Sequence, residues 1–170
     1  TNTAFTATTT ADASVGSFVV NVNQVAKAQA LTTGSYANNT DLLGDTTGTT
    51  RKITITQPGT KTPLEVTLAD GDTSLAGIAS AINKANGNVT ASVIKAKDGD
   101  YRLMLSSKTT GTDGEMTISV TGDDKLQNAI GYNSTTKTGA LTVNTGAQNA
   151  IEVVNSISIE RQTNTITDAL

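Results

Sequence analysis

The chain has 170 residues and a formal net charge of −3 at pH 7, with 36% hydrophobic and 3% aromatic residues. This length suffices for one medium domain or two small ones. Because no basic patch with interleaved aromatic residues is present, we expect no nucleic-acid partner. The apolar runs span only a few residues, so we expect no membrane-spanning segment and no membrane partner.

Cysteine and histidine are both absent from the chain. A disulfide framework and thiolate chemistry are therefore excluded, and the usual general base at neutral pH and the commonest zinc ligand are missing. We expect no catalytic residue, no cofactor-binding residue, no cofactor and no metal site. A composition rich in Thr, Asn and Gly without Cys favours an extracellular bacterial protein, or one threaded unfolded through an export channel. We expect the chain to be a fragment of a longer protein.

The first fifty residues predict one strand and little other regular structure. Residues 1–13 are polar and are expected to form an extended edge segment. Apolar residues recur at every second position from Phe18 to Val22, which indicates a strand. A short helical turn is expected at 25–31. Residues 32–50 carry scattered Gly and Asn and predict a loop or a domain boundary.

A sharper pattern begins at Arg51. Alternating apolar residues predict strands at 51–56 and 64–68, joined by a turn at 58–59. An amphipathic helix is expected over about 73–87, because apolar residues recur there at the spacing of one helix face. The residues of that face are Leu75, Ile78, Ala79 and Ile82.

A hairpin is expected next, with strands at 89–97 and 101–105 around the Asp98-Gly99 turn. A further strand is expected at 116–120, so that the region 51–120 has the order ββαβββ. A short helix then follows over 123–130, with Gly131 ending it and three residues inward: Leu126, Ala129 and Ile130.

The last thirty residues predict a final β region. Apolar residues at 141–143 and 151–159 indicate strands, with an irregularity at Asn155-Ser156. Residues 163–170 are polar, with Ile166 and Leu170 expected to face inward.

These elements predict a β-rich α+β fold with antiparallel sheets and a short amphipathic helix. Two small globular domains are expected, the second inserted into the first. The first domain is discontinuous and β-rich and comprises 1–45 and 138–170. The inserted α+β domain comprises 46–137.

Two acidic turns and one polar loop contain residue types that occur in chemical sites. Asp70-Gly-Asp72 and Asp98-Gly-Asp100 could supply Ca²⁺ ligands, but neither stretch has the terminal Glu of an EF-hand loop, so a helix cap and a hairpin turn are expected. The stretch 134–139 contains Ser-x-x-Lys and Lys-Thr-Gly, motifs of penicillin-recognising enzymes, yet one lysine serves both. A polar loop is expected there.

The remaining charged and apolar groups have structural interpretations. Asp123-Asp124 is expected to cap a helix N-terminus, where negative charge is favourable. Arg51-Lys52, and Lys95 with Lys97, are expected on solvated strand faces. Carboxylate pairs for glycoside hydrolysis are available by count, but nearly all of them lie in expected turns. The helix stripe at 75–82 is expected to pack on its own sheet, and 32–50 is the better candidate for subunit or host contacts.

Three segments carry a resemblance to a known family. Residues 16–31, GSFVVNVNQVAKAQAL, are similar to the segment that opens the first globular domain of flagellar filament-capping proteins, the hook-associated protein 2 or FliD type. Residues 150–170 resemble the return to that domain, and the family often has Asn-Gly where Asn155-Ser156 stands here. The part between looks like the repeat shared by flagellins and hook-associated proteins, through TSLAGIASAIN at 73–83, VTASV at 89–93, YRLMLSS at 101–107 and Gly111.

The resemblance implies a non-enzymatic subunit of the cap at the distal tip of the bacterial flagellar filament, which promotes assembly of exported flagellin. It implies a ring-shaped homo-oligomer with flagellin as partner, and with junction proteins and host mucus as further contacts. It also implies an extracellular location reached through the flagellar export apparatus. Two alternatives stay open: an extracellular adhesin or carbohydrate-binding surface module, and an outer domain of another flagellin-related protein.

Overall fold

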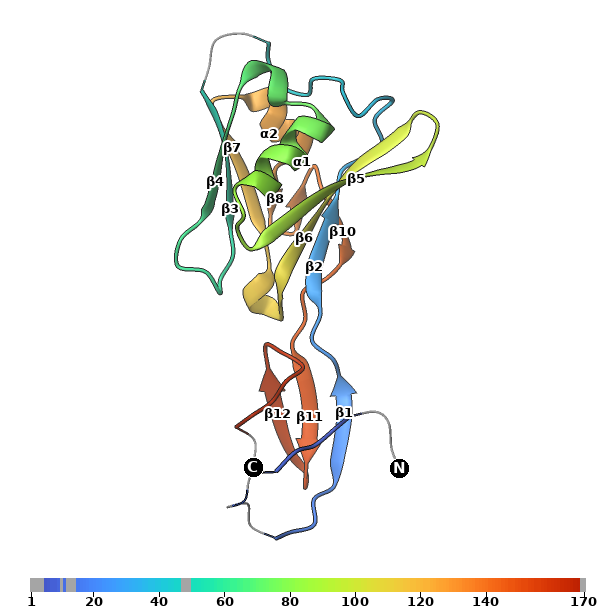
Figure 1. The fold of residues 1–170 in the computed structure, drawn as a ribbon, viewed down its shortest axis with the longest axis vertical. Helices are drawn as coiled ribbons and strands as arrows, with labels where there is room; N and C mark the ends of the chain where they lie inside the picture. The colour runs from blue at the N-terminus through green and yellow to red at the C-terminus, as the bar shows by residue number, and fades with distance from the viewer. Residues whose placement is uncertain (1–4, 10, 12–14, 47–49, 169–170) are drawn as a thin grey trace.

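The structure is a computed structural model that describes residues 5–9, 11, 15–46 and 50–168. Figure 1 shows an elongated molecule with a small three-stranded sheet at one end and a larger unit of two sheets and two helices at the other. All strand pairs of the described residues are antiparallel. The predicted β-rich α+β class with antiparallel sheets is confirmed.

The smaller sheet has the strand order β1-β11-β12. Its strands are β1 (Val20–Gln24), β11 (Ala150–Val154) and β12 (Ile157–Arg161). The irregularity expected at Asn155-Ser156 is a two-residue hairpin turn, in which the two residues have φ values of 46° and 72°. Two positive φ angles are those of a type I′ turn, whose twist matches that of the flanking strands.

A four-stranded sheet forms one side of the larger unit, in the order β10-β2-β6-β5. It consists of β10 (Thr142–Thr145), β2 (Ala28–Thr32), β6 (Asp100–Thr110) and β5 (Val89–Lys97). The expected helical turn at 25–31 is wrong, because most of that segment is strand β2. Its backbone pairs on both sides, with Leu31 opposite Leu105 and Val143. These pairings override the weak helix preference of its alanines.

A five-stranded sheet forms the other side, in the order β4-β3-β7-β8-β9. Its strands are β4 (Leu64–Leu68), β3 (Arg51–Thr56), β7 (Thr117–Thr121), β8 (Tyr132–Asn133) and β9 (Thr138–Gly139). From β3 to β7 the order of strands and α-helices is ββαβββ, as predicted.

Two helices cover the larger unit (Figure 1). Helix α1 (Leu75–Lys84) begins after Ser74, whose hydroxyl accepts a hydrogen bond from the Gly77 amide. Helix α2 (Asp124–Ile130) begins after Asp123, whose carboxylate accepts from the Leu126 amide, and the cap expected there is confirmed. Two short 3₁₀ helices lie at Asp70–Asp72 and Thr112–Gly114.

The hydrophobic core lies between the two sheets under these helices. The four apolar residues predicted for the face of α1 are all buried, so this face packs on its own sheets as expected. Each fully buried Leu or Ile contributes roughly 1.5–3 kcal/mol to folding. The fully buried apolar side chains include Leu31, Ile53, Ile55, Leu75, Ile78, Ile82, Val89, Leu103, Leu105, Met116, Ile118, Leu126 and Ile130.

The ends of the chain are less regular than the larger unit. Residues 5–9 form neither helix nor strand, and the rest of the edge segment expected at 1–13 lies almost wholly outside the described residues. Ile166 is half-buried, and Leu170 lies outside the described residues.

The two ends of the molecule meet at a narrow waist, where the chain passes between them twice (Figure 1). Lys27 and Gln148 form an isolated bridge there, with the Lys27 amide 2.9 Å from the Gln148 carbonyl oxygen. Strands β2 and β10 lie beyond this bridge and pair within the larger unit. We propose that the chain forms an inserted domain of 28–145 and a discontinuous domain on either side of it. This proposal keeps the insertion and moves the boundaries expected at 45/46 and 137/138 to the waist.

Candidate interaction surfaces

Three of the carboxylates considered as Ca²⁺ ligands, those of Asp70, Asp98 and Asp100, are engaged with cations of the chain. Asp70 lies 2.6 Å from Arg51 Nη1, and Asp98 lies 2.6 Å from Lys95 Nζ. Asp100 accepts from Arg102 Nε at 3.0 Å. Among the described residues, no group of three or more His, Cys, Asp or Glu side chains could hold a metal ion.

The candidate penicillin-type motif lies on the loop between β8 and β9. The Lys137 ammonium pairs with Glu115, and the Ser134 hydroxyl lies 2.6 Å from that of Thr117. The two motif residues therefore bond to different neighbours, and the loop is largely exposed. In the part of the chain that the structure describes, no helix is long and apolar enough to cross a membrane.

Arg51 is buried, which corrects the expectation that it lies on a solvated strand face. Its side chain is 0% exposed, and Nε donates to Asp123 Oδ2 at 2.8 Å. Nη1 donates to Asp70 and Nη2 to the backbone oxygen of Asp45 at 2.6 Å. The planar guanidinium therefore joins strand β3, the start of α2 and the end of the loop 32–46. Lys52, Lys95 and Lys97 are half-buried or exposed, as expected for a strand face.

The same network sets the ionisation of Asp123. Burial alone raises the pKa of this carboxyl, but hydrogen bonds from the backbone amides of Leu126 and Asp45 and from Arg51 outweigh it, so the pKa lies below its usual value. Gly44 allows the Asp123 carboxylate to lie against the backbone here, because a Cβ added to Gly44 would lie 2.3 Å from Asp123 Oδ2.

Side-chain amides hold the waist together. Asn164 forms two hydrogen bonds with Ala26, accepting from its amide at 2.6 Å and donating to its carbonyl oxygen at 3.0 Å. Asn149 accepts from the Thr112 amide at 2.8 Å, and Gln162 accepts from the Asp113 amide at 3.1 Å. The two ends of the molecule are thus joined by fixed, directional polar contacts.

The β5–β6 hairpin projects from the body of the larger unit (Figure 1). We call its distal part, residues 93–102, the arm. On the β6 side, Tyr36 covers the base of the arm through two backbone hydrogen bonds of 2.9 Å with Tyr101. On the other side β5 is the end of its sheet. Ile94 is 40% exposed on the arm.

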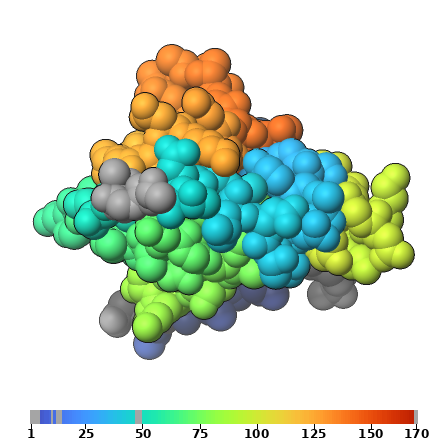
Figure 2. Space-filling view, turned by 90° about the horizontal axis from the view of Figure 1, so that it is seen from above, coloured from blue at the N-terminus to red at the C-terminus, as the bar shows by residue number. Residues whose placement is uncertain are grey.

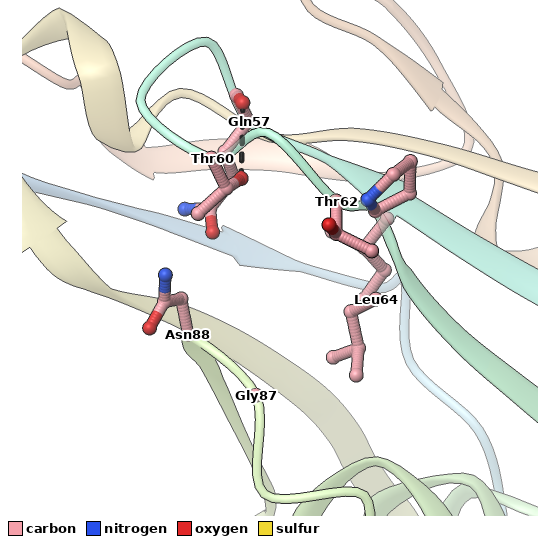
Figure 3. Close-up of a pocket in the computed structure, with 8 residues that line it drawn as sticks. Gln57, Thr60, Thr62, Leu64, Gly87 and Asn88 are labelled. Atoms are coloured by element: carbon pink, nitrogen blue, oxygen red, sulfur yellow. Dashed lines mark hydrogen bonds between the residues drawn. The ribbon is translucent and has the colours of Figure 1, made fainter.

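Two hollows lie on the larger unit. The smaller, of about 190 Å³, lies between the β3–β4 turn and residues 87–88, and Figure 3 shows Thr60 and Asn88 on its two sides. This volume is below the several hundred Å³ typical of small-molecule sites. The larger hollow, of about 500 Å³, lies between β4 and α1, and we call it the β4–α1 groove.

The small sheet exposes apolar side chains. The strand register places Val20, Val154 and Ile157 side by side on one face, with Val22 and Ile159 two residues further along. Ile157 is 69% and Val22 is 42% exposed. Val154, which lies between Val20 and Ile157 on this face, is only 6% exposed.

The described residues thus present sheet edges, an arm and a polar waist, which are features of a structural domain. Residues 52–109 match the family described as "Flagellin hook IN motif". A flagellar hook-associated protein 2 of Xenorhabdus nematophila is 47% identical, and the match covers 97% of this chain and 36% of that protein. The chain therefore spans about a third of the curated relative's length.

Solved structures agree with this match. The crystal structure of the D2-D3 domains of the Escherichia coli flagellar cap protein FliD has a TM-score of 0.91 and 39% identity, covering 98% of this chain and 84% of that one. A structure of the D1-D2-D3 domains of the E. coli protein also has a TM-score of 0.91, with 40% identity and coverage of 99% and 49%. The chain belongs to the flagellar hook-associated protein 2 (FliD) family.

Proposed function

We propose that this chain is the globular part of a subunit of the flagellar filament cap at the distal tip, where it promotes assembly of exported flagellin. The observation that carries the proposal is the 39% identity and 0.91 TM-score over almost the whole chain with the D2-D3 domains of a flagellar cap protein. The match to the flagellin hook motif over 52–109 supports it. The function is structural and uses no cofactor.

The proposed partners follow from this role. The subunit forms a ring with copies of itself through head-to-tail contacts, in which one patch meets a different patch on the neighbour. Flagellin is the protein that the ring folds into place, and hook-associated junction proteins and host mucus are further contacts. The protein reaches its extracellular position through the flagellar export apparatus.

Deletion of the parent gene tests the cap role directly. We expect absent or stunted filaments and monomeric flagellin in the culture medium, both reversed by the intact gene. Normal filaments and a medium free of flagellin would refute the role, and binding to glycan arrays would then test the adhesin alternative.

A strain with a defective flagellar export apparatus tests the route. We expect the protein to stay inside such cells and to reach the medium or filament tip in the parent strain. Export that continues in the defective strain would show that another pathway carries it.

A further inference from the structure

The hydrophobic core of the larger unit does not extend into the small sheet. Its cluster of buried apolar side chains runs from Leu31 to Leu141 and, among the described residues, includes no side chain of β1, β11 or β12. The contact between the two parts of the molecule therefore depends on polar groups, which also bond well to water. Domains joined without a large apolar interface are expected to move relative to each other unless specific bonds hold them.

The backbone crossings at the waist form a narrow joint. The Lys27 amide lies 2.9 Å from the Gln148 carbonyl oxygen, and the Gln148 amide lies 3.2 Å from that of Lys27. The strand register is irregular on both sides of this bridge, at 22–24 in β1, at 28–30 in β2 and at 143–145 in β10. Such irregularities bend a strand and interrupt its ladder. In the part of the chain that the structure describes, no continuous sheet crosses the waist.

A second set of contacts joins the turn after β6 to the small sheet. Figure 1 shows this gold turn at the lower end of the larger unit, above the tip of β12. Asn149 Oδ1 accepts from the Thr112 amide at 2.8 Å, and Gln162 Oε1 accepts from the Asp113 amide at 3.1 Å. The Gln162 carbonyl oxygen accepts from the Thr110 hydroxyl at 2.8 Å. We call these three hydrogen bonds the latch.

The side chains of the latch lie close against the turn. Gly111 has a φ of 76°, and a Cβ added to it would lie 2.8 Å from Asn149 Oδ1 and closer still to Gln162 Oε1. The Asn149 amide nitrogen donates to Glu160 at 2.6 Å, and that of Gln162 donates to the Thr112 hydroxyl at 3.2 Å. These bonds orient both amide groups with their oxygens toward the backbone of the turn.

A change of angle at the waist would be largest at the outer ends of the larger unit. Figure 2, seen along the long axis, shows the arm on one side and the β3–β4 hairpin on the other. Both lie away from the axis, so a rotation about the waist displaces them further than it displaces the waist itself. The arm is therefore a sensitive place from which to measure the angle.

We propose that the Lys27–Gln148 bridge is a hinge and that the latch holds the two parts of the molecule at one angle. Asn149 and Gln162 are then positioning residues. When the latch opens, both parts stay folded and the small sheet rotates about the bridge. Both side chains are half-buried, so water reaches the latch and replaces its bonds. This device belongs to the fold and does not depend on the proposed function.

Distances between spin labels in the full-length protein, in a background without other cysteines, test the hinge. Ser158→Cys on β12 and Lys97→Cys on the arm, both exposed, report the angle. We expect a narrow distance distribution in the parent chain, and one at least about twice as broad when Asn149→Ala and Gln162→Ala are combined. The pair Lys61→Cys and Lys97→Cys lies within the larger unit and should stay narrow in both.

The matched control is Asn23→Ala, which removes an exposed amide of β1 and should leave both distributions unchanged. A distance between Ser158 and Lys97 that is equally narrow in the parent and the double variant overturns the proposal. Broadening of the pair within the larger unit also overturns it, because the contacts would then maintain the fold of that unit and not its angle.

Amide hydrogen exchange provides an independent test. The Thr112 and Asp113 amides bond across the latch, whereas the Gly114 amide bonds to the Gly111 carbonyl oxygen at 3.0 Å within the turn. If the latch opens while the turn stays folded, the first two amides should be at least about tenfold less protected than Gly114 in the parent chain. We expect Gln162→Ala to lower their protection about tenfold further and to leave Gly114 unchanged.

Equal protection of the three amides in the parent chain would overturn the proposal, because the turn would then unfold together with its contacts. A loss of protection at Gly114 in the Gln162→Ala variant would overturn it for the same reason. The cap role is tested separately by gene deletion, so failure of the hinge and failure of the cap role are distinguishable.

Discussion

The Nε atom of Arg51 donates to Oδ2 of Asp123 at 2.8 Å, and both side chains are 0% exposed. The two residues stand 72 positions apart and come from β3 and the start of α2. Their contact therefore fixes α2 on the five-stranded sheet. Because both charges are out of water, each depends on the other for its compensation.

Loss of one partner should strongly destabilise the chain. We expect Arg51→Met to lower the free energy of unfolding by about 3–5 kcal/mol, because it leaves the Asp123 carboxylate buried without its cation. Lys52→Met is the control: Lys52 pairs with Glu65 where both are about half exposed, and the loss should be at most about 1 kcal/mol. Denaturant titration measures both, and equal losses would contradict the role of burial.

Stability should be almost flat near neutral pH and fall in acid. The chain has no histidine, so no side chain with an ordinary pKa changes charge between pH 5 and 8. The pKa of Asp123 is lower in the folded than in the unfolded chain, so its contribution is present above about pH 4, the unfolded value, and is lost as pH falls through the folded one.

The Asp123→Asn variant isolates this contribution, since Asn keeps a capping oxygen and cannot titrate. We expect it to be less stable at pH 7 and to lose less stability than the parent chain between pH 4 and pH 2. Parallel acid profiles of the two chains would assign the acid transition to other carboxylates.

The turn between β11 and β12 carries avoidable strain. Ser156 has a φ of 72°, a conformation that glycine adopts more easily than any residue with a Cβ. We expect Ser156→Gly to stabilise the chain by about 0.5–1 kcal/mol. Ser158→Gly, two residues on in β12, should instead destabilise it, because there the extended backbone suits any residue. Thermal unfolding of the two variants compares them.

The waist should depend on the Asn164 amide. We expect Asn164→Ala to cost about 1–2 kcal/mol, because the buried Ala26 residue loses the partners of its amide and carbonyl groups. The Ala26 amide should also exchange with solvent faster. Asn38→Ala, which loses only exposed bonds to Asp41, should change neither quantity. Unchanged exchange at Ala26 in Asn164→Ala would show that the waist is held by other contacts.

Local patterns predicted the helix and the hairpins correctly. The face of α1, the turn at Asp98-Gly99 and the cap at Asp123 each depend on residues close in sequence, and each is confirmed. Strand β2 was missed because its partners, β6 and β10, lie at least 70 positions away, and nothing local distinguishes its alanines from those of a helix.

The position of Arg51 in its strand pattern indicates burial, although its charge favours an exposed position. Arg51 stands two and four positions before Ile53 and Ile55, so it shares their inward face in a strand. The acidic partners that compensate it follow 19 and 72 positions later. The β4–α1 groove could not be predicted, because it depends on how a strand edge and a helix from separate segments sit together.

The bridge between Lys27 and Gln148 means that the chain enters and leaves the larger unit at neighbouring points. Segments whose ends lie this close can be exchanged as a cassette without rebuilding the host domain. Evolution can thus enlarge, shorten or replace everything between the two crossing points while the small sheet keeps its strand register. The same property makes 28–145 a place to graft a foreign domain, with the retained hairpin at Asn155-Ser156 as an internal check that the host sheet still forms.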